Sequence, residues 1–119
     1  MNVLILEDEP LIAMSMEALI EDEGWRAVGP FAAVEDALAA ILGGVVIDCA
    51  LLDCNLGGVP SWPVADGLAE RGVPFAFTSG QLAADIEPRF ADRPIFAKPI
   101  DETRVKGFLA EQAAALLAQ

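Results

Sequence analysis

The sequence contains no histidine and only two cysteines, so it lacks the ligands of an ordinary zinc site. Basic residues are also scarce, because seven lysines and arginines stand against 19 aspartates and glutamates and leave a net charge of −12. Nucleic-acid binding relies on basic side chains that neutralise phosphates. The charge balance therefore argues against a nucleic-acid partner, and it disfavours anionic membrane surfaces for the same reason.

Long apolar runs, repeats and low-complexity tracts are missing as well. No stretch approaches the roughly 20 apolar residues of a membrane-spanning helix, and the chain reaches Glu7 without the basic segment of a signal peptide. With 55% apolar residues the chain is not intrinsically disordered. We expect a cytoplasmic protein with no membrane contact and one domain over residues 1–119.

The two cysteines, Cys49 and Cys54, lie in or next to an apolar run that predicts a strand. An odd separation along a strand turns two side chains to opposite faces of the sheet, so we expect no disulfide between them. Both are predicted to be small buried hydrophobes in a reducing compartment.

Short apolar runs alternate with helical patterns along the chain. The predicted strands are Val3–Leu6, Trp25–Val28 (closed by Gly29-Pro30), Val45–Leu52, Val73–Thr78 and Pro94–Ala97. The predicted helices start at Pro10 and stop at Gly24, cover Val34–Leu42, run from about Ser61 to Arg71, and run from the capping residue Asp101 to about Leu117. Five β units with helical links predict an α/β fold, a (βα)5 doubly wound parallel five-stranded sheet in the flavodoxin-like order 2-1-3-4-5.

Two segments, Val45–Leu52 and Gln81–Arg93, differ from the rest of the alternating pattern. The run Val45–Leu52 is continuously apolar apart from Asp48, as expected for a parallel strand buried on both faces. The stretch Gln81–Arg93 carries Pro88, has few apolar residues in helical period and is short for a helix. We expect a reduced or irregular fourth helix there.

Polar side chains follow four of the predicted strands at their carboxyl ends, where the functional crevice of an open parallel sheet lies. They are Glu7 and Asp8 after the first strand, Asp53 after the third, Thr78 and Ser79 at the fourth, and Lys98 after the fifth. Three carboxylates in one crevice repel one another, and a divalent cation with oxygen ligands and retained waters, such as Mg²⁺, relieves that repulsion. Lys98 and Ser79 would clamp an anion, and Asp53 becomes a candidate nucleophile that forms an aspartyl phosphate.

Each of these residues also has an ordinary structural explanation. The acidic pair Glu7-Asp8 would favour the positive N-terminus of the next helix, and Asp53 would cap the loop that follows it. Ser79-Gly80 is a common turn pair, and Lys98-Pro99 is a common strand exit. For any single residue the structural explanation is the simpler one. Because all of them would have to coincide at one end of one sheet, we favour the functional explanation.

In this order and spacing the motifs resemble the receiver domain of bacterial response regulators, over the whole chain. Receivers carry an acidic pair after the first strand, the phosphorylated Asp after the third, a Thr or Ser after the fourth and Lys-Pro after the fifth; here these are Glu7-Asp8, Asp53, Ser79 and Lys98-Pro99. The resemblance implies that Asp8, Asp53 and the backbone carbonyl of Asn55 bind Mg²⁺ directly, while Glu7 acts through water. It also implies that Lys98 pairs with Asp53 before phosphoryl transfer and with the phosphoryl group afterwards.

Thr78 and Ser79 compete for the role of the switch hydroxyl, which bonds a phosphoryl oxygen and draws the next loop inward. In receivers this residue usually follows the proline of the fourth strand by five positions and precedes a small residue, so Pro74 and Gly80 select Ser79. Thr78 is then expected on the other face of the pleat. Asn55 and Gln81, two residues past the acceptor and the switch hydroxyl, occupy positions where receivers tune hydrolysis.

Finer features resemble the stand-alone receivers nicknamed FAT GUY, which often work with HWE-type histidine kinases. The matching segments are Val3–Pro10, Leu51–Gly58, Pro74–Phe77 and Lys98-Pro99. The chain departs from the namesake motif, because Thr78-Ser79-Gly80 stands where that motif runs from Ala through Thr to Gly. A second departure is Ile95, which occupies the place of the aromatic residue that many receivers move with the switch hydroxyl, while Phe96 should face the other way.

Two enzymatic or ligand-binding alternatives fit less well. A flavodoxin-like FMN binder needs a phosphate loop after the first strand, where Glu7-Asp8-Glu9 would repel the phosphate. A phosphohydrolase of the haloacid dehalogenase type generally carries Asp-x-Asp, whereas this chain has Asp53-Cys54-Asn55 and is short for a substrate cap.

The resemblance implies a stand-alone response regulator that takes a phosphoryl group onto Asp53 from a sensor histidine kinase or a histidine phosphotransfer protein. Its output would be a protein contact, or it would act as a phosphate sink, as a monomer or weak dimer without separate substrate turnover. The alternative is a receiver-fold interaction module that works without phosphorylation. Such modules usually lose the acceptor, the lysine or the acidic pair, and Asp53, Lys98 and Glu7-Asp8 are all present.

Overall fold

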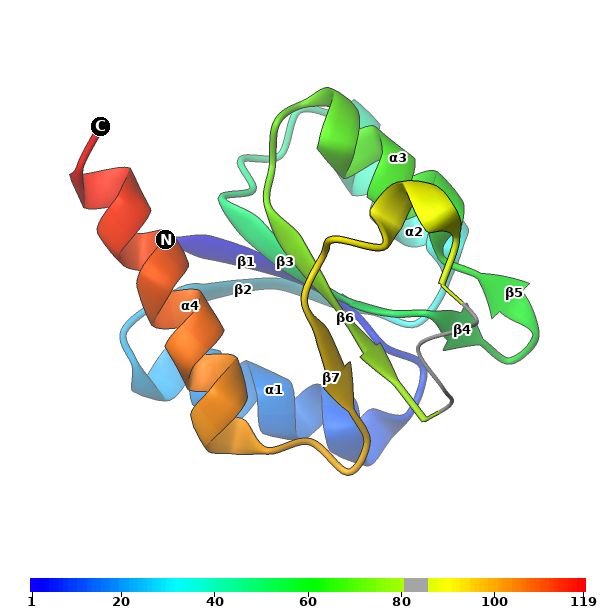
Figure 1. Ribbon diagram of the computed structural model, residues 1–119, viewed down its shortest axis with the longest axis horizontal. Helices are drawn as coiled ribbons and strands as arrows, with labels where there is room; N and C mark the ends of the chain where they lie inside the picture. The colour runs from blue at the N-terminus through cyan, green and yellow to red at the C-terminus, as the bar shows by residue number, and fades with distance from the viewer. Residues whose placement is uncertain (81–85) are drawn as a thin grey trace.

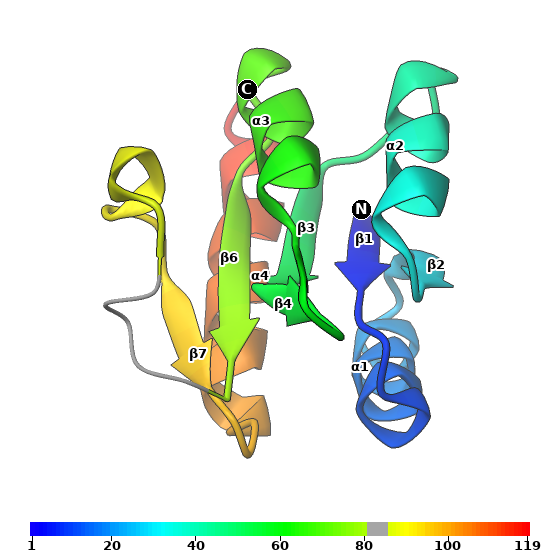
Figure 2. The ribbon, with the colours of Figure 1, turned by 90° about the vertical axis from the view of Figure 1, so that its right-hand side faces the viewer.

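The computed structural model describes residues 1–80 and 86–119. Its central sheet contains five parallel strands in the order β2-β1-β3-β6-β7, which confirms the predicted doubly wound topology (Figure 1). The strands are β1 (Asn2–Leu6), β2 (Arg26–Phe31), β3 (Cys49–Asp53), β6 (Phe75–Ser79) and β7 (Ile95–Ala97). All neighbouring strands of this sheet run in the same direction, so the carboxyl ends of β1, β6 and β7 meet at one edge of the sheet (Figure 2).

Among the described residues, four α-helices cover the two faces of the sheet. They are α1 (Pro10–Asp22), α2 (Val34–Leu42), α3 (Trp62–Glu70) and α4 (Glu102–Leu117). Helices α2 and α3 lie on one face and α1 and α4 on the other (Figure 1). Alternate strand residues bury their side chains against each pair of helices, as Leu4 and Leu52 do under α2 and α3, and Ile5 and Leu51 do under α1 and α4. The core is therefore split into two layers by the sheet.

The ends of the helices follow from local chemistry. Pro10 opens α1, where a missing N–H costs nothing. The carboxylate of Asp101 caps α4 by accepting hydrogen bonds from the backbone N–H groups of Thr103, at 3.0 Å, and Arg104, at 3.4 Å. The predicted cap at Asp101 is confirmed. In the part of the chain that the structure describes, no helix is both long and apolar enough to cross a membrane.

The predicted end of the second strand was wrong. Strand β2 continues through Gly29-Pro30 to Phe31, and its register against β1 shifts between Leu4 and Leu6. Gly29 makes this bulge possible, because its φ is +99° and an added Cβ would lie 2.7 Å from the backbone nitrogen of Phe31. The ladder then resumes, and the N–H of Glu7 donates to the carbonyl of Phe31 at 2.9 Å.

The predicted start of the third strand was also wrong. Strand β3 begins at Cys49, and residues 45–48 form the approach to it, where Val45 and Val46 are exposed. Asp48 fixes this approach, because its carboxylate accepts a hydrogen bond of 2.6 Å from the N–H of Asn2. A hydrophobic run alone cannot reveal that its first half lies beyond the covering helices.

The described part of the segment after β6 contains little helix. Residues 81–85 lie outside the described residues, and the described remainder, residues 86–93, contains a single 3₁₀ turn at Pro88–Phe90 and no α-helix. This agrees with the reduced fourth helix expected for Gln81–Arg93. Ile95 and Phe96 face opposite sides of the sheet as predicted, with Ile95 against the α2 and α3 layer and Phe96 in the α1 and α4 layer.

Cys49 and Cys54 are both buried, and neither belongs to a disulfide. Cys49 belongs to the core under α1 and α4, and Cys54 to the core under α2 and α3. The prediction of two buried thiols on opposite faces without a disulfide is confirmed.

Candidate functional site

A crevice of about 680 Å³ lies at the carboxyl edge of the sheet. Its lining residues come from the loops after β1, β3, β6 and β7: Asp8, Glu9, Asp53, Cys54, Asn55, Gly57, Pro60, Trp62, Ser79, Gly80 and Lys98. The predicted strand-end residues Asp8, Asp53, Ser79 and Lys98 are therefore brought together in one place. Their roles in chemistry remain predictions.

Three carboxylates form a cluster at the base of this crevice. Oxygen atoms of Glu7, Asp8 and Asp53 lie within 4.8 Å of one another. Glu7 and Asp53 are buried, whereas Asp8 is exposed at the mouth. Leu6 pairs with Leu52, so that the next residues, Glu7 and Asp53, lie side by side at the carboxyl ends of β1 and β3. The cluster thus follows directly from the register of β1 and β3.

Lys98 supplies the cation that faces these acids. Its Nζ lies 2.9 Å from Glu7 Oε1 and 3.1 Å from Asp53 Oδ2. The backbone places it there, because the N–H of Lys98 donates to the carbonyl of Ser79 at 2.8 Å and so ties the end of β7 to the end of β6. Sequence reasoning paired Lys98 with Asp53 alone, and the structure adds Glu7 as its partner.

Burial and pairing shift the pKa values of this pair. Burial raises the pKa of Glu7 above its ordinary value, and the nearby Asp53 charge adds to the increase, against the opposing effect of Lys98 and the Glu9 N–H. For Lys98, burial lowers the pKa, but the contacts with Glu7 and Asp53 outweigh burial and raise it overall. Lys98 therefore stays charged at neutral pH.

The loop after β3 holds the Asp53 side chain in place. The N–H of Asn55 donates to Asp53 Oδ1 at 3.2 Å, and Asn55 Oδ1 in turn accepts from the N–H of Gly58 at 2.6 Å. These bonds belong to a small hairpin, β4 (Asn55–Leu56) and β5 (Val59–Pro60), which the sequence did not reveal. Gly57 and Gly58 turn the hairpin with φ of +61° and +94°.

The two candidate switch hydroxyls lie in different places. Ser79 lines the crevice, and Thr78 does not. The Thr78 side chain is fully buried, beside Asp53 on β3 and Phe96 on β7. This placement agrees with the expected opposite faces. Gln81, the predicted hydrolysis-tuning residue on this loop, lies outside the described residues.

The donors of the cluster fit a hard divalent cation. Carboxylate oxygens from Glu7, Asp8 and Asp53 are the type of ligand that Mg²⁺ prefers, and the open side at Asp8 leaves room for water. Asn55 lines the same crevice, where its backbone carbonyl was predicted as a further ligand. The site can hold a metal on these grounds.

Sequence reasoning missed Trp62 at this site. Trp62 opens α3 and reaches the crevice because the β4–β5 hairpin folds back, so that the N–H of Ser61 donates to the carbonyl of Cys54 at 3.1 Å. Its ring centroid lies 5.6 Å from that of Phe77 on β6 and 5.9 Å from that of Phe90 in the 3₁₀ turn. Trp62 therefore links the crevice to the segment after β6.

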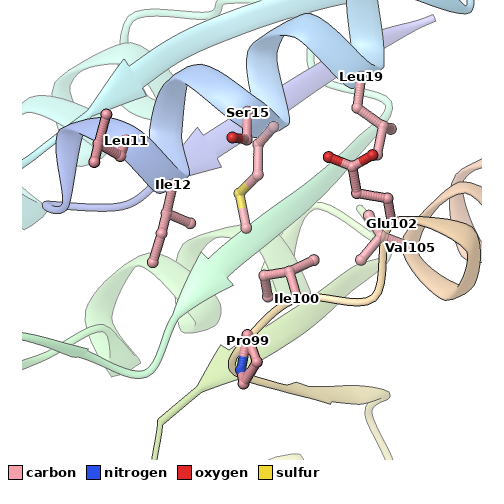
Figure 3. Close-up of a pocket in the computed structure, with 9 residues that line it drawn as sticks. Leu11, Ile12, Ser15, Leu19, Pro99, Ile100, Glu102 and Val105 are labelled. Atoms are coloured by element: carbon pink, nitrogen blue, oxygen red, sulfur yellow. The ribbon is translucent and has the colours of Figure 1, made fainter.

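A separate apolar groove lies between α1 and the start of α4 (Figure 3). Figure 3 shows Leu11, Ile12 and Ser15 from α1 on one side and Pro99 and Ile100 on the other. Leu11 is 79% exposed at its rim. Since Pro99 directly follows Lys98, the groove and the crevice share one border.

Comparisons with known proteins agree on the kind of domain. No family model matches the chain. The chain is similar to SdrG from Sphingomonas melonis Fr1, with 43% identity over 94% of this chain and 95% of that chain and a TM-score of 0.81. A second solution structure of SdrG, in a BeF3-activated conformation, matches with a TM-score of 0.76 over 92% of each chain.

Two further relatives are more distant. The response regulator REC domain of PhyR from Erythrobacter litoralis is 28% identical, with a TM-score of 0.76 over 94% of this chain and 88% of that chain. The positive alginate biosynthesis regulatory protein of Pseudomonas aeruginosa is 33% identical over 75 residues, which are 62% of this chain and 30% of that protein. The match thus spans less than a third of that regulatory protein.

Proposed function

Because the chain belongs to the response regulator receiver domains, we propose that it is a stand-alone receiver in a two-component phosphorelay. A histidine kinase or a histidine phosphotransfer protein would transfer a phosphoryl group onto Asp53 in a Mg²⁺-dependent reaction. The observation that carries this proposal is the position of the Asp53 carboxylate, 3.1 Å from Lys98 and within 4.8 Å of two further carboxylates.

The chemistry follows from these contacts. An Asp53 oxygen attacks phosphorus, the bond between phosphorus and the donor histidine nitrogen breaks, and the nitrogen keeps the electron pair. Lys98 is charged and moves from the carboxylate to the phosphoryl oxygens, while Ser79 donates to one of them. Bound Mg²⁺, held by Asp8, Asp53 and the Asn55 carbonyl, would neutralise the charge that gathers on the phosphoryl group. We expect no separate substrate turnover.

We place the chain in the FAT GUY group and propose an HWE-type kinase as its donor. The matching segments around Asp53 and Pro74 support this grouping. SdrG itself has a BeF3-activated conformation, and the mimic acts on receivers as a phosphoryl substitute. The output would be a protein contact or a phosphate sink in the cytoplasm. The alternative, an interaction module that is never phosphorylated, predicts that Asp53 takes no phosphoryl group.

The test is intact-mass spectrometry after incubation with a small phosphodonor, with and without Mg²⁺. We expect a single phosphoryl increment on the wild type that requires Mg²⁺ and is absent in Asp53→Asn, which keeps the size of the side chain and removes the nucleophile. If small donors give no increment, phosphotransfer from HWE-type kinases is measured next. Failure with both donors, or persistent labelling of Asp53→Asn at one site, would contradict the proposal.

We propose that the phosphodonor protein docks in the groove between α1 and α4. A donor histidine must reach Asp53, and the groove borders the crevice at Lys98-Pro99, so a helix of the donor would cover both. We expect Leu11→Asp to slow phosphotransfer from the kinase at least about 10-fold, because it places a charge in an apolar contact. Labelling by a small phosphodonor should stay unchanged, since Leu11 is 79% exposed and does not line the crevice.

Leu117→Asp is the matched control, because Leu117 is 89% exposed at the far end of α4. It makes the same chemical change outside the groove and should leave both rates unchanged. Equal phosphotransfer to Leu11→Asp and wild type would place the donor elsewhere.

A further inference from the structure

One buried hydroxyl near the crevice has no hydrogen-bond partner among residues 1–80 and 86–119. Thr78 has no exposed surface, and its Oγ1 makes no hydrogen bond to any of the described residues. Thr78 also does not line the crevice, which Ser79 does. A buried hydroxyl without a partner has lost its hydrogen bonds to water without forming new ones, which costs free energy. A methyl group in its place would therefore be more favourable. Valine, which is similar in shape and favoured in strands, would suit this position better in the state that the structure describes.

The register of the sheet places this hydroxyl beside the proposed phosphoacceptor. Thr78 pairs with Asp53 across β3 and β6, and with Phe96 across β6 and β7. Paired residues of neighbouring parallel strands direct their side chains to the same face of the sheet. Asp53 is therefore the polar neighbour of Thr78 on β3, and Phe96 offers no acceptor on the other side.

Phosphorylation would change the hydrogen-bond partners that the Asp53 oxygens require. Before transfer, Asp53 Oδ1 accepts from the Asn55 N–H at 3.2 Å, and Oδ2 pairs with Lys98 at 3.1 Å. After transfer one of these oxygens bridges to phosphorus, and Lys98 turns to the phosphoryl group. When Oδ1 is the oxygen that bonds to phosphorus, Oδ2 remains as the side-chain carbonyl oxygen and has lost the lysine next to it. Rotation of χ1 of Thr78 by about 120° moves the hydroxyl to the position of the methyl group and the methyl group to the position of the Cβ hydrogen, between two staggered rotamers.

We propose that Thr78 is a positioning residue whose hydroxyl donates to the Asp53 side chain once Asp53 is phosphorylated. The inference rests on the proposed function, because it needs a phosphorylated Asp53. It gives the second hydroxyl of β6 a role distinct from that of Ser79, which faces the phosphoryl group from the crevice. It also explains why a hydroxyl that is unfavourable in one state is present at all.

The experiment measures thermal unfolding with and without Mg²⁺ and beryllofluoride, which stands in for the phosphoryl group on Asp53. Without beryllofluoride, Thr78→Val should unfold at or above the wild-type temperature. With it, the rise in unfolding temperature should be smaller than in wild type, and beryllofluoride should bind about 3- to 10-fold more weakly, the usual effect of one lost hydrogen bond. Thr78→Ser keeps the hydroxyl and should restore the wild-type response.

Thr103→Val is the control, because Thr103 is exposed on α4 and is the chain's other threonine. It should respond to beryllofluoride as wild type does. Equal responses of Thr78→Val and wild type would overturn the inference and leave phosphoryl acceptance standing. If Thr78→Val does not fold, Thr78→Ala removes the same hydroxyl and gives the same comparison. A wild type that neither responds to beryllofluoride nor gains a phosphoryl group would remove the proposed function, and the inference with it.

Discussion

The balance between Lys98 and the carboxylates that surround it determines the net charge of the crevice. One ammonium faces the carboxylates of Glu7 and Asp53, whose side chains are 0% and 7% exposed. Asp8 adds a third carboxylate at the mouth. When all three carboxylates are ionised, Lys98 balances one of their three negative charges. A divalent cation would balance the remaining two. Burial raises the pKa of Glu7, which means that its ionised form costs free energy when no metal is bound to the cluster.

Cys49 is a second residue whose ionisation is tied to burial. Burial, followed by the neighbouring charge of Asp48, raises the pKa of the Cys49 thiol from 9.0 to about 12. The folded state therefore keeps the thiol protonated where the unfolded chain releases the proton. The contribution of the protonated Cys49 thiol to the stability of the folded state is complete below pH 9 and is lost as the pH rises toward 12.

We expect this linkage to be measurable by urea unfolding at two pH values. Between pH 8 and about pH 10.5, Cys49 should account for a loss of about 2 kcal/mol in the free energy of unfolding. Cys49→Ala should lose correspondingly less over the same interval, whatever its stability at pH 8. Parallel pH profiles for the two proteins would show that Cys49 does not titrate on unfolding in this range.

At the scale of elements, the 3₁₀ turn Pro88–Phe90 is attached to the domain in two ways. The Arg89 guanidinium pairs with both carboxylate oxygens of Asp66 on α3, at 3.0 and 2.9 Å, but these side chains are 50% and 45% exposed. Phe90 is only 3% exposed, and its ring packs against Trp62, Phe75 and Phe77. An exposed ion pair is worth about 0–1 kcal/mol, and a buried aromatic ring several times more. The aromatic contact therefore holds the turn.

Two substitutions separate these contributions. Phe90→Ala should lower the free energy of unfolding by about 3 kcal/mol or more, and Arg89→Ala should lower it by much less. Urea unfolding followed by far-UV circular dichroism gives both values. Similar losses for the two variants would mean that the ion pair, and the stacking of Arg89 on Phe90, contribute more than their exposure suggests.

The strand order was predictable at this scale because each buried strand is a short apolar run and each functional residue follows one. The errors lie where tertiary context overrides a local signal. Gly29-Pro30 is a breaker by sequence, yet it forms a bulge inside β2 because Gly29 accepts φ of +99°. Val45 and Val46 continue an apolar run but precede β3 and are 46% and 65% exposed.

The site was predictable in its strand-end residues and not in its loops. Asp53 and Lys98 are fixed by strand ends, which a pattern of apolar runs locates to within a residue or two. Trp62 arrives through the β4–β5 hairpin, whose two-residue strands are too short to leave a period in the sequence. The second partner of Lys98, Glu7, emerged only from measured distances.

At the scale of the whole molecule, the net charge of −12 on 119 residues is the dominant electrostatic feature. Like charges on a compact surface repel one another, and dissolved salt screens that repulsion over a Debye length of about 10 Å at 0.1 M. Part of any stabilisation by Mg²⁺ is therefore general screening, and only the remainder reports on the carboxylate cluster.

Thermal unfolding at matched ionic strength separates the two effects. Raising NaCl from about 20 mM to about 300 mM should increase the unfolding temperature by a few degrees. Mg²⁺ should raise it further than NaCl of equal ionic strength, and Asp8→Asn should lose that extra rise while it keeps the NaCl effect. If Mg²⁺ and matched NaCl act alike on the wild type, the cluster does not select a divalent cation.

The two tryptophans lie at opposite ends of the strands. Trp25 precedes β2 and packs against the core under α1 and α4, while Trp62 lines the crevice and contacts Phe77 and Phe90. An excited indole is sensitive to nearby charge and solvent, so the emission of Trp62 depends on what occupies the crevice. Trp25 supplies a steady background from the other end. The protein thus carries its own optical probe, and a Trp25→Phe variant would isolate the signal without any added dye.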